Sequence, residues 1–385
     1  MSLRQIIEQE IRERGPIPFS RYMELCLYHP ELGFYSRDIE QFGKAGDFYT
    51  SSDVHAVFGR LLARQFEEMW RVLGSPAQIE IVELGPGRGL FAQDVLEWSR
   101  KKFPEFFEAL HYSLSECSPI LREKLRRRLD KCLKIGKVSL VSDNALNGLP
   151  AAPALGLEIP VIVFANEFFD AFPVEILSSQ GSLRVCLQDD RFMETWASPS
   201  SGELEFLDRY GAQPEPGERM EVPLRATRYM SRLAASVRRG FIIAIDYGYT
   251  RHEQLAGCHR GTLMAYRQHS ATANPYEAPG EQDLTAHVNF TALAAAAKEN
   301  GLKVQPLLTQ SQFLMGIGEK NQFADAFEEC GLPQERAKVA LQLKHLVTPA
   351  GMGEKFRVLI AAKAVDQQRV AGLSGLSFVS SELNA

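Results

Sequence analysis

Long apolar runs are missing from this sequence of 385 residues, and no stretch approaches the roughly 20 apolar residues that a helix needs to span a bilayer. We therefore expect no membrane insertion. Positive charge is not in excess either, because 43 Lys and Arg face 48 Asp and Glu, a net charge of −5. This balance argues against a nucleic-acid partner, since proteins that bind phosphate backbones carry clustered Lys and Arg.

Cysteine is scarce and scattered. The six cysteines lie at positions 26, 117, 132, 186, 258 and 330 and form no C-x-x-C pair, so we expect reduced thiols and no metal site. The first residues hold no apolar core of a secretory signal, and Glu8, Glu10 and Glu13 argue against an acid-poor mitochondrial presequence. The sequence predicts a cytoplasmic protein.

Hydrophobic patterning predicts helices that alternate with short apolar strands after residue 75. Continuous apolar strands separated by helices are typical of a parallel sheet that is covered on both faces. We expect an α/β fold of the doubly wound class. The predicted strands are 79–84, 111–115, 137–141, 161–165, 241–245, 302–308 and 356–362.

Shifts in composition predict seven segments. They are a helical and loop-rich N-terminal cap (1–75), the first part of the core (76–177), a β-rich insertion (178–230), the fifth core strand (231–249), an insertion over the active site (250–285), the end of the core (286–365) and a flexible Ser/Gly-rich tail (366–385). Glycines in 33–53 suggest a loop that closes over a bound ligand.

A glycine loop follows the first predicted strand in IEIVELGPGRGL, residues 79–90. Gly85, Gly87 and Gly89 permit tight turning and close approach of the backbone to a ligand. Leu90 stands where a dinucleotide fingerprint requires its third glycine, and the Gly-Lys-Ser/Thr of a P-loop is missing. A plain turn remains an alternative. The acid at Glu83 followed by alternate glycines resembles motif I of class I S-adenosylmethionine-dependent methyltransferases, whose cofactor carries an ammonium and a sulfonium.

Polar residues follow the next two predicted strands as well. Glu116 can accept both hydroxyls of a ribose, and Asp143 and Asn144 can accept the amine of adenine. Glu116 alone could instead cap the helix that begins near Pro119. Three such features at the ends of successive strands favour a nucleoside-type cofactor.

The fourth strand ends in ANEFFDAFP, residues 165–173, which places an amide and two carboxylates beside aromatic rings. Asn166, Glu167 and Asp170 can orient a cationic or amine nucleophile and accept its proton, while Phe168 offers a ring to a methyl group. Asn166 or Asp170 could instead cap a turn.

The chain resembles the MidA-type family of class I methyltransferases, which includes a mitochondrial methyltransferase of complex I assembly. The segments that carry the resemblance are FSRYMELCLYHPELGFYS (19–36), GDFYTSSDVHAVFG (46–59), VELGPGRG (82–89), LSECSPILR (114–122), FANEFFDAFPV (164–174), IDYGY (245–249), RGTLMAYRQH (260–269), DLTAHVNFTAL (283–293), FLMGIG (313–318) and MGEKFRVLIAAK (352–363). The resemblance implies a mostly parallel, seven-stranded Rossmann-like sheet.

The resemblance also implies S-adenosyl-L-methionine as cofactor and a protein arginine as methyl acceptor, in a subunit of respiratory complex I. The catalytic residues would be Asn166, Glu167 and Asp170. The cofactor would be bound by Thr50, Glu83, Gly85, Gly87, Gly89, Glu116, Asp143 and Asn144, and the substrate by Phe168, Tyr247 and His287. A lone histidine before a helix is more often structural.

Two rival functions stay open at this point. The enzyme could methylate a small amine or hydroxyl metabolite, or the chain could be an assembly chaperone that binds the cofactor without turnover. Methylation of nucleic-acid bases is disfavoured, because the loop reads Asn-Glu-Phe-Phe where base amino-methyltransferases have Asn/Asp-Pro-Pro-Tyr. The oligomeric state is not predicted.

Overall fold

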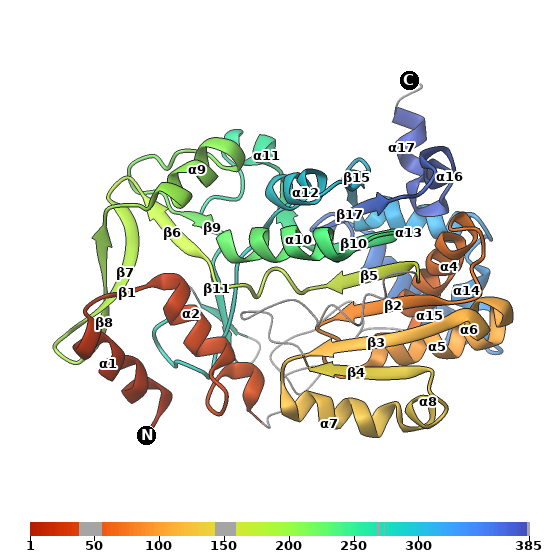
Figure 1. The fold of residues 1–385 in the computed structure, drawn as a ribbon, viewed down its shortest axis with the longest axis horizontal. Helices are drawn as coiled ribbons and strands as arrows, with labels where there is room; N and C mark the ends of the chain where they lie inside the picture. The colour runs from red at the N-terminus through yellow and green to blue at the C-terminus, as the bar shows by residue number, and fades with distance from the viewer. Residues whose placement is uncertain (38–55, 143–158, 268–269, 273, 383–385) are drawn as a thin grey trace. The chain divides into compact units, whose positions relative to one another are not determined.

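The computed structural model describes residues 1–37, 56–142, 159–267, 270–272 and 274–382, which Figure 1 draws in colour. The chain divides into two compact units, each made of three segments. Unit 1 comprises Met1–Phe48, Phe168–Met230 and Gly248–Ala295, and unit 2 comprises Tyr49–Glu167, Ser231–Tyr247 and Ala296–Ala385.

Unit 2 holds the large sheet of the molecule and the helices around it. Its elements are α4 (Ala56–Val72), β2 (Ile79–Leu84), α5 (Leu90–Lys102), α6 (Pro104–Ala109), β3 (Leu110–Glu116), α7 (Pro119–Arg128), α8 (Asp130–Lys134), β4 (Val138–Ser142), β5 (Val161–Asn166), β15 (Lys303–Val304), β16 (Leu308–Thr309), α13 (Gln310–Glu319), α14 (Ala324–Phe327), α15 (Pro333–Val347), β17 (Phe356–Lys363), α16 (Gln367–Ala371), η2 (Ser374–Leu376) and α17 (Ser377–Glu382). Helix α10 (Leu224–Ser236), strand β10 (Gly240–Tyr249) and helix α12 (Phe290–Glu299) run from one unit into the other along the chain.

The strands of this sheet follow the order β15-β17-β10-β5-β2-β3-β4, and Figure 1 shows β5, β2, β3 and β4 lying side by side. The four pairings from β10 through β5, β2 and β3 to β4 are parallel, whereas β17 is antiparallel to β10. The predicted mostly parallel α/β fold is therefore confirmed. Within the described residues the sheet has nine strands, because β14 (Val288–Asn289) pairs with the end of β10 and β16 pairs with β17.

The central strands are buried on both faces, as their continuous apolar sequences predict. All six residues of β2 are buried, and so are the first five of β5. Because side chains alternate along a strand, every second residue faces one helical layer. Ile79 and Ile81 share one core cluster with helices α4, α5 and α13, and that cluster includes Phe66, Phe91 and Phe164.

Unit 1 combines helices with two smaller antiparallel sheets. One sheet has the order β1-β7-β6-β9 with β8 paired to β7, and the other has the order β12-β11-β13. The elements are α1 (Leu3–Arg14), β1 (Ile17–Pro18), α2 (Phe19–Tyr28), η1 (Phe34–Ser36), β6 (Glu175–Ser178), β7 (Gly181–Gln188), β8 (Arg191–Ala197), α9 (Ser201–Tyr210), β9 (Met220–Val222), α11 (Arg251–Leu255), β11 (Met264–Arg267), β12 (Ser270–Thr272) and β13 (Asp283–Thr285).

Helix α1 is fixed to unit 1 by its apolar stripe. Leu3, Ile7 and Ile11 recur at helical spacing and are buried with α2 and strand β7 in one core cluster. The Ser2 side chain caps the helix by accepting a hydrogen bond from the backbone N–H of Gln5. The N-terminal segment is therefore an integral part of unit 1.

The tail predicted to be flexible is instead folded up to Glu382, where the described residues end. It forms α16, η2 and α17, and Val370, Leu373 and Leu376 are buried in the core of unit 2. The backbone N–H of Gly375 donates to Oε1 of the buried Gln65 at 2.9 Å. Composition misled here because three spaced apolar residues bury this segment despite its serines and glycines.

Gly240 offers a test of how tightly the sheet is packed. Its φ is +139°, and a Cβ atom there would lie 1.8 Å from the carbonyl oxygen of Val161 on β5. We expect Gly240→Ala to lower the free energy of unfolding by about 2 kcal/mol or more, through backbone strain and loss of the β5 pairing. Thermal melts monitored by circular dichroism would measure the loss. Gly202→Ala, in helix α9 with no atom near the new Cβ, is the control and should be neutral or slightly stabilising. Equal melting temperatures for the two variants would contradict the expectation.

Candidate cofactor and methyl-acceptor site

The glycine loop joins the end of β2 to the start of α5. Gly85, Gly87 and Gly89 have φ values of +63°, +53° and +73°, a left-handed conformation that favours glycine at each position. The backbone N–H of Gly85 donates to the carbonyl oxygen of Ser115 on β3 at 3.0 Å, and that of Gly89 donates to Pro86 at 2.9 Å. The loop is thus a compact turn tied to the neighbouring strand.

Gly89 is also the N-cap of α5, and it has no side chain that could accept from the helix's first N–H groups. A Cβ atom there would lie 2.5 Å from Cδ2 of Leu125, so only glycine lets α7 approach the loop this closely. The arrangement presents backbone donors and the positive end of a helix dipole at the carboxyl edge of the sheet.

Two buried carboxylates lie at the ends of adjacent strands, Glu83 on β2 and Glu116 on β3, each with a relative exposure of 5%. Oε2 of Glu83 accepts a hydrogen bond from the hydroxyl of Tyr112 at 2.8 Å, and Oε1 of Glu116 accepts from the backbone N–H of Ser118 at 2.9 Å. Burial raises the pKa of Glu83 to about 8 and that of Glu116 to about 7. The hydrogen bonds to each group offset only part of this rise.

The end of β5 carries two of the predicted catalytic residues. The backbone N–H of Glu167 donates to Ile245 on β10 at 2.9 Å, and Nδ2 of Asn166 donates to Oε1 of Glu167 at 3.1 Å. Glu167 has φ +50°, a left-handed conformation that costs a non-glycine residue about 1 kcal/mol or more. Oδ1 of Asn166 is buried and accepts no hydrogen bond from any described residue. A strained carboxylate residue beside an unsatisfied buried acceptor is typical of a binding site.

The third predicted catalytic residue, Asp170, belongs to unit 1 and is buried at 5% exposure. Its backbone carbonyl accepts from the N–H of Ala286 at 3.0 Å. Burial raises the pKa values of Tyr35 and Tyr266, and the charge of Asp170 contributes to both shifts. Asp283 accepts a hydrogen bond from the hydroxyl of Tyr35 at 3.0 Å. Asp170 therefore has acidic and phenolic neighbours within unit 1.

Tyr35, Tyr266 and Asp283 were not among the predicted site residues. They belong to the segments GFYS, GTLMAYRQH and DLTAHV, where only the resemblance of these segments to the MidA-type family could have drawn attention to them. Tyr35 lies in η1, Tyr266 in β11 and Asp283 in β13, so their proximity depends on long-range contacts that no local pattern encodes.

The predicted substrate-binding residues fall into separate surroundings. The ring of Phe168 contacts those of Phe169, Phe172 and Tyr229 in unit 1. Tyr247, in unit 2, lies against Phe356 with a centroid distance of 3.9 Å. Thr50, Asp143 and Asn144 lie outside the described residues, as does most of the 33–53 loop that is predicted to close over the cofactor.

His287 lies next to His259, with 3.2 Å between their Nδ1 atoms, and its backbone N–H donates to Oγ1 of Thr262. Burial, together with His259, lowers the pKa of His287 to about 4. The imidazole is therefore neutral at pH 7.

Residues 61–308 match the family model described as "Putative S-adenosyl-L-methionine-dependent methyltransferase". The match runs from helix α4 to strand β16 and covers well over half of the chain. It includes the glycine loop and the end of β5.

Curated relatives are similar along nearly the whole chain. The Drosophila melanogaster "Protein arginine methyltransferase NDUFAF7 homolog, mitochondrial" is 29% identical over 97% of this chain and 89% of that protein. The "Protein arginine methyltransferase NDUFAF7, mitochondrial" of Danio rerio is 28% identical over 96% and 89%, and that of Homo sapiens is 26% identical over 90% and 80%.

Two solved structures of Burkholderia thailandensis proteins resemble this chain over 97% of its length and 94% of theirs, both with a TM-score of 0.79. One is 26% identical and was crystallised with S-adenosyl-homocysteine bound, and the other is 27% identical. The likeness thus extends over both units of the chain.

These relatives contradict the predicted cytoplasmic location, because all three named above are mitochondrial proteins. The prediction relied on Glu8, Glu10 and Glu13, which belong to the folded helix α1 and carry no information about compartment. Separately, no helix among the described residues is long and apolar enough to cross a membrane.

The buried carboxylates lead to a prediction about proton linkage. Glu116 and Glu83 bind protons below about pH 7 and 8, whereas a cationic ligand with hydroxyl donors favours their ionised forms. We expect the affinity for S-adenosyl-L-methionine to rise between pH 6 and 8 with release of protons. Without ligand, the free energy of unfolding should fall as the pH rises over the same range, because folding raises both pKa values and the folded chain then holds more protons than the unfolded chain.

Calorimetric titrations in two buffers with different ionisation enthalpies would measure the released protons. Glu83→Gln and Glu116→Gln should each reduce the pH dependence, and Glu83→Gln can keep the hydrogen bond from Tyr112. A wild-type affinity that stays constant from pH 6 to 8.5 would contradict the assignment.

Proposed function

This chain belongs to the family of S-adenosyl-L-methionine-dependent methyltransferases, and on that premise we propose that it transfers the methyl group to an arginine of a protein substrate. The cofactor is S-adenosyl-L-methionine. The arginine acceptor is supported by the names of the curated relatives, which are protein arginine methyltransferases. The sequence resemblance extends the proposal to a subunit of respiratory complex I and to a Rossmann-like, doubly wound core.

The described residues fit this cofactor. Three glycines with left-handed backbone and an α5 terminus free of capping side chains leave room for a ligand against the main chain. Glu116 can accept the ribose hydroxyls, and Glu83 offers negative charge to the ammonium of the methionine moiety. We assign Gly85, Gly87 and Gly89 to the loop that holds the cofactor.

The observation that carries the arginine proposal is the pair formed by Asn166 and Glu167. The unsatisfied Oδ1 of Asn166 and the carboxylate of Glu167 are both acceptors, and a guanidinium offers five N–H donors in a fixed plane. Asp170 follows Glu167 by three residues in the sequence and adds a third acceptor to the proposed substrate set. A hydroxyl metabolite would have only one donor for these groups.

When bound, S-adenosyl-L-methionine supplies the methyl group in electrophilic form. Asn166 and Glu167 then have two tasks: to hold the guanidinium nitrogen in line with that group, and to stabilise its charge. One carboxylate oxygen of Glu167 accepts the proton that the nitrogen loses. Phe168, Tyr247 and His287 remain proposed contacts of the substrate chain.

Two substitutions of Glu167 separate the effect of its carboxylate on turnover from the effect of its backbone strain on stability. Glu167→Gln keeps the size of the side chain and removes the base, so we expect turnover to fall about 100-fold or more while S-adenosyl-homocysteine binds as before. Glu167→Gly removes the carboxylate and also the strain at φ +50°, so it should leave the melting temperature unchanged or raised.

The assay is transfer of radiolabelled methyl to proteins of a mitochondrial lysate, followed by identification of methylarginine. Gly87→Val, which fills the glycine loop, is the control that should lose cofactor binding as well. Full methylation by Glu167→Gln would refute the role of this carboxylate. Methylation of a small metabolite alone, or cofactor binding without any turnover, would support one of the rival functions instead.

A further inference from the structure

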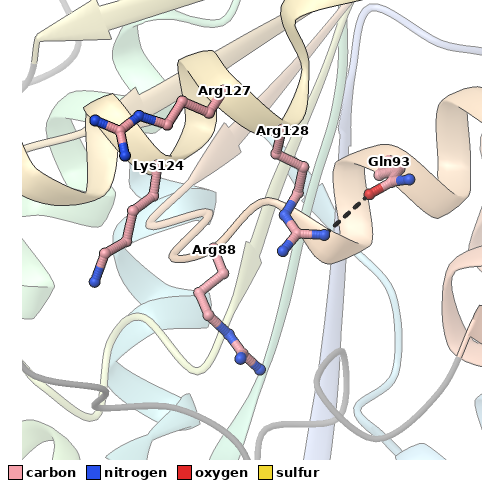
Figure 2. A pocket seen from close by; sticks show the side chains of 5 residues that line it. All are labelled: Arg88, Gln93, Lys124, Arg127 and Arg128. Atoms are coloured by element: carbon pink, nitrogen blue, oxygen red, sulfur yellow. Dashed lines mark hydrogen bonds between the residues drawn. The ribbon is translucent and has the colours of Figure 1, made fainter.

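A cavity of about 510 Å³ lies in unit 2 beside the glycine loop. Figure 2 shows the five described residues whose side chains line it, which are Arg88, Gln93, Lys124, Arg127 and Arg128. Four of these five are cationic, and none of the five is acidic. We call this set the cationic pocket.

The fold builds the cationic pocket from two helices and the loop between β2 and α5. Lys124, Arg127 and Arg128 follow the i, i+3, i+4 spacing and therefore project from the same side of α7. Because Gly89 has no side chain, α7 can lie against the start of α5. A Cβ atom added at Gly89 would lie 3.7 Å from Cδ of Arg128. The pocket thus depends on the same glycine that shapes the cofactor loop.

Basic residues outnumber acids in the helical segment that carries three of these side chains. Residues 119–134 carry seven Lys and Arg against two acids, in a chain whose net charge is −5. The carboxylate of Glu123 forms ion pairs with both Arg127, at 3.1 Å, and Arg126, at 3.6 Å. Arg128 donates to the neutral Oε1 of Gln93 at 3.1 Å, as the dashed line in Figure 2 marks. Exposed ion pairs of this kind neutralise little of the surrounding field.

The charge of the cationic pocket disfavours the acceptor guanidinium, because like charges repel each other. It also disfavours the sulfonium and the ammonium of the cofactor, whose carboxylate is its one anionic group. The pocket suits an anion. Its volume matches a few carboxylate side chains, whereas a nucleic acid needs a longer cationic track.

We propose that the cationic pocket docks an acidic segment of the protein substrate, an inference that rests on the proposed function. The substrate would then be bipolar, with its arginine at the acidic end of β5 and its carboxylates on α7. Such opposite charges would fix the direction in which the peptide lies and exclude purely basic arginine-rich segments.

Binding can be tested apart from turnover with a fluorescein-labelled peptide that contains six glutamates and no arginine. We expect saturable binding to the full chain by fluorescence anisotropy, weakening as salt is raised. Arg127→Glu and Arg128→Glu should each weaken it about tenfold. Arg126→Glu is the matched control, because Arg126 is adjacent, shares Glu123 and does not line the pocket, so its effect should stay within about twofold.

Competition at constant ionic strength shows which class of anion the cationic pocket binds: an acidic peptide, a small anion or a nucleic acid. Peptide binding that persists in 5 mM inorganic phosphate and exceeds that of a single-stranded oligonucleotide of equal charge supports the proposal. Complete displacement by phosphate would overturn it in favour of a small-anion site, and tighter oligonucleotide binding with the same variant pattern would overturn it in favour of a nucleic acid. Absence of saturable binding, or equal losses in Arg126→Glu and Arg127→Glu, would also overturn it.

Turnover separates the two proposals. With arginine peptides that differ only in an acidic or a neutral flank, the acidic flank should lower KM, and Arg127→Glu should remove that preference with kcat and S-adenosyl-homocysteine affinity unchanged. Equal KM values with full turnover would overturn the docking site and leave the proposed function standing. Specific binding of the acidic probe without methylation of any protein would overturn the proposed function and leave an acidic-peptide site standing.

Discussion

The site depends above all on the register of three parallel strands. Glu83 pairs with Leu114, and Leu84 pairs with both Ser115 and Ala165, so β2, β3 and β5 end within one or two residues of each other. The chain segments that follow these strands, beginning at Gly85, Cys117 and Glu167, therefore leave the sheet at a common edge. A shift of one residue in any pairing would turn each buried side chain of that strand to the opposite face, so the hydrophobic core and the site are specified by the same contacts.

Several residues at this edge are unfavourable for folding, and their proposed contacts with a ligand would account for them. Burying Glu83 and Glu116 forces both carboxyl groups toward their protonated forms. Glu167 adopts a left-handed backbone that glycine would tolerate better, and Asn166 leaves a buried oxygen without a hydrogen bond from any described residue. Local sequence preferences and the fold disagree at these positions, and such disagreement concentrates where a protein binds or reacts.

The sequence predicted the elements that carry local signals. Apolar runs located β2 and β5, and alternate glycines located the turn that follows β2. Contacts between distant segments had no such signal, since no local pattern pairs Tyr35 with Asp283, 248 residues away. The C-terminal helices were missed for the same reason, since the hydrogen bond from Gly375 to Gln65 is invisible in a Ser/Gly-rich stretch. Local patterns specify which face of an element is buried, whereas the partner of that face is set by the whole chain.

Helix α7 links the two kinds of charge in unit 2. It begins just after Glu116, and the positive charge of Arg122 in its first turn lowers the pKa of that carboxyl, although burial remains the larger effect. Further along, the same helix presents Lys124, Arg127 and Arg128 to the cationic pocket. Reversing a charge far along α7 should leave Glu116 almost untouched, because exposed charges are screened over about 8–10 Å in physiological salt. One short helix would therefore tune an acid of the proposed cofactor site and attract the proposed acidic segment as two nearly independent functions.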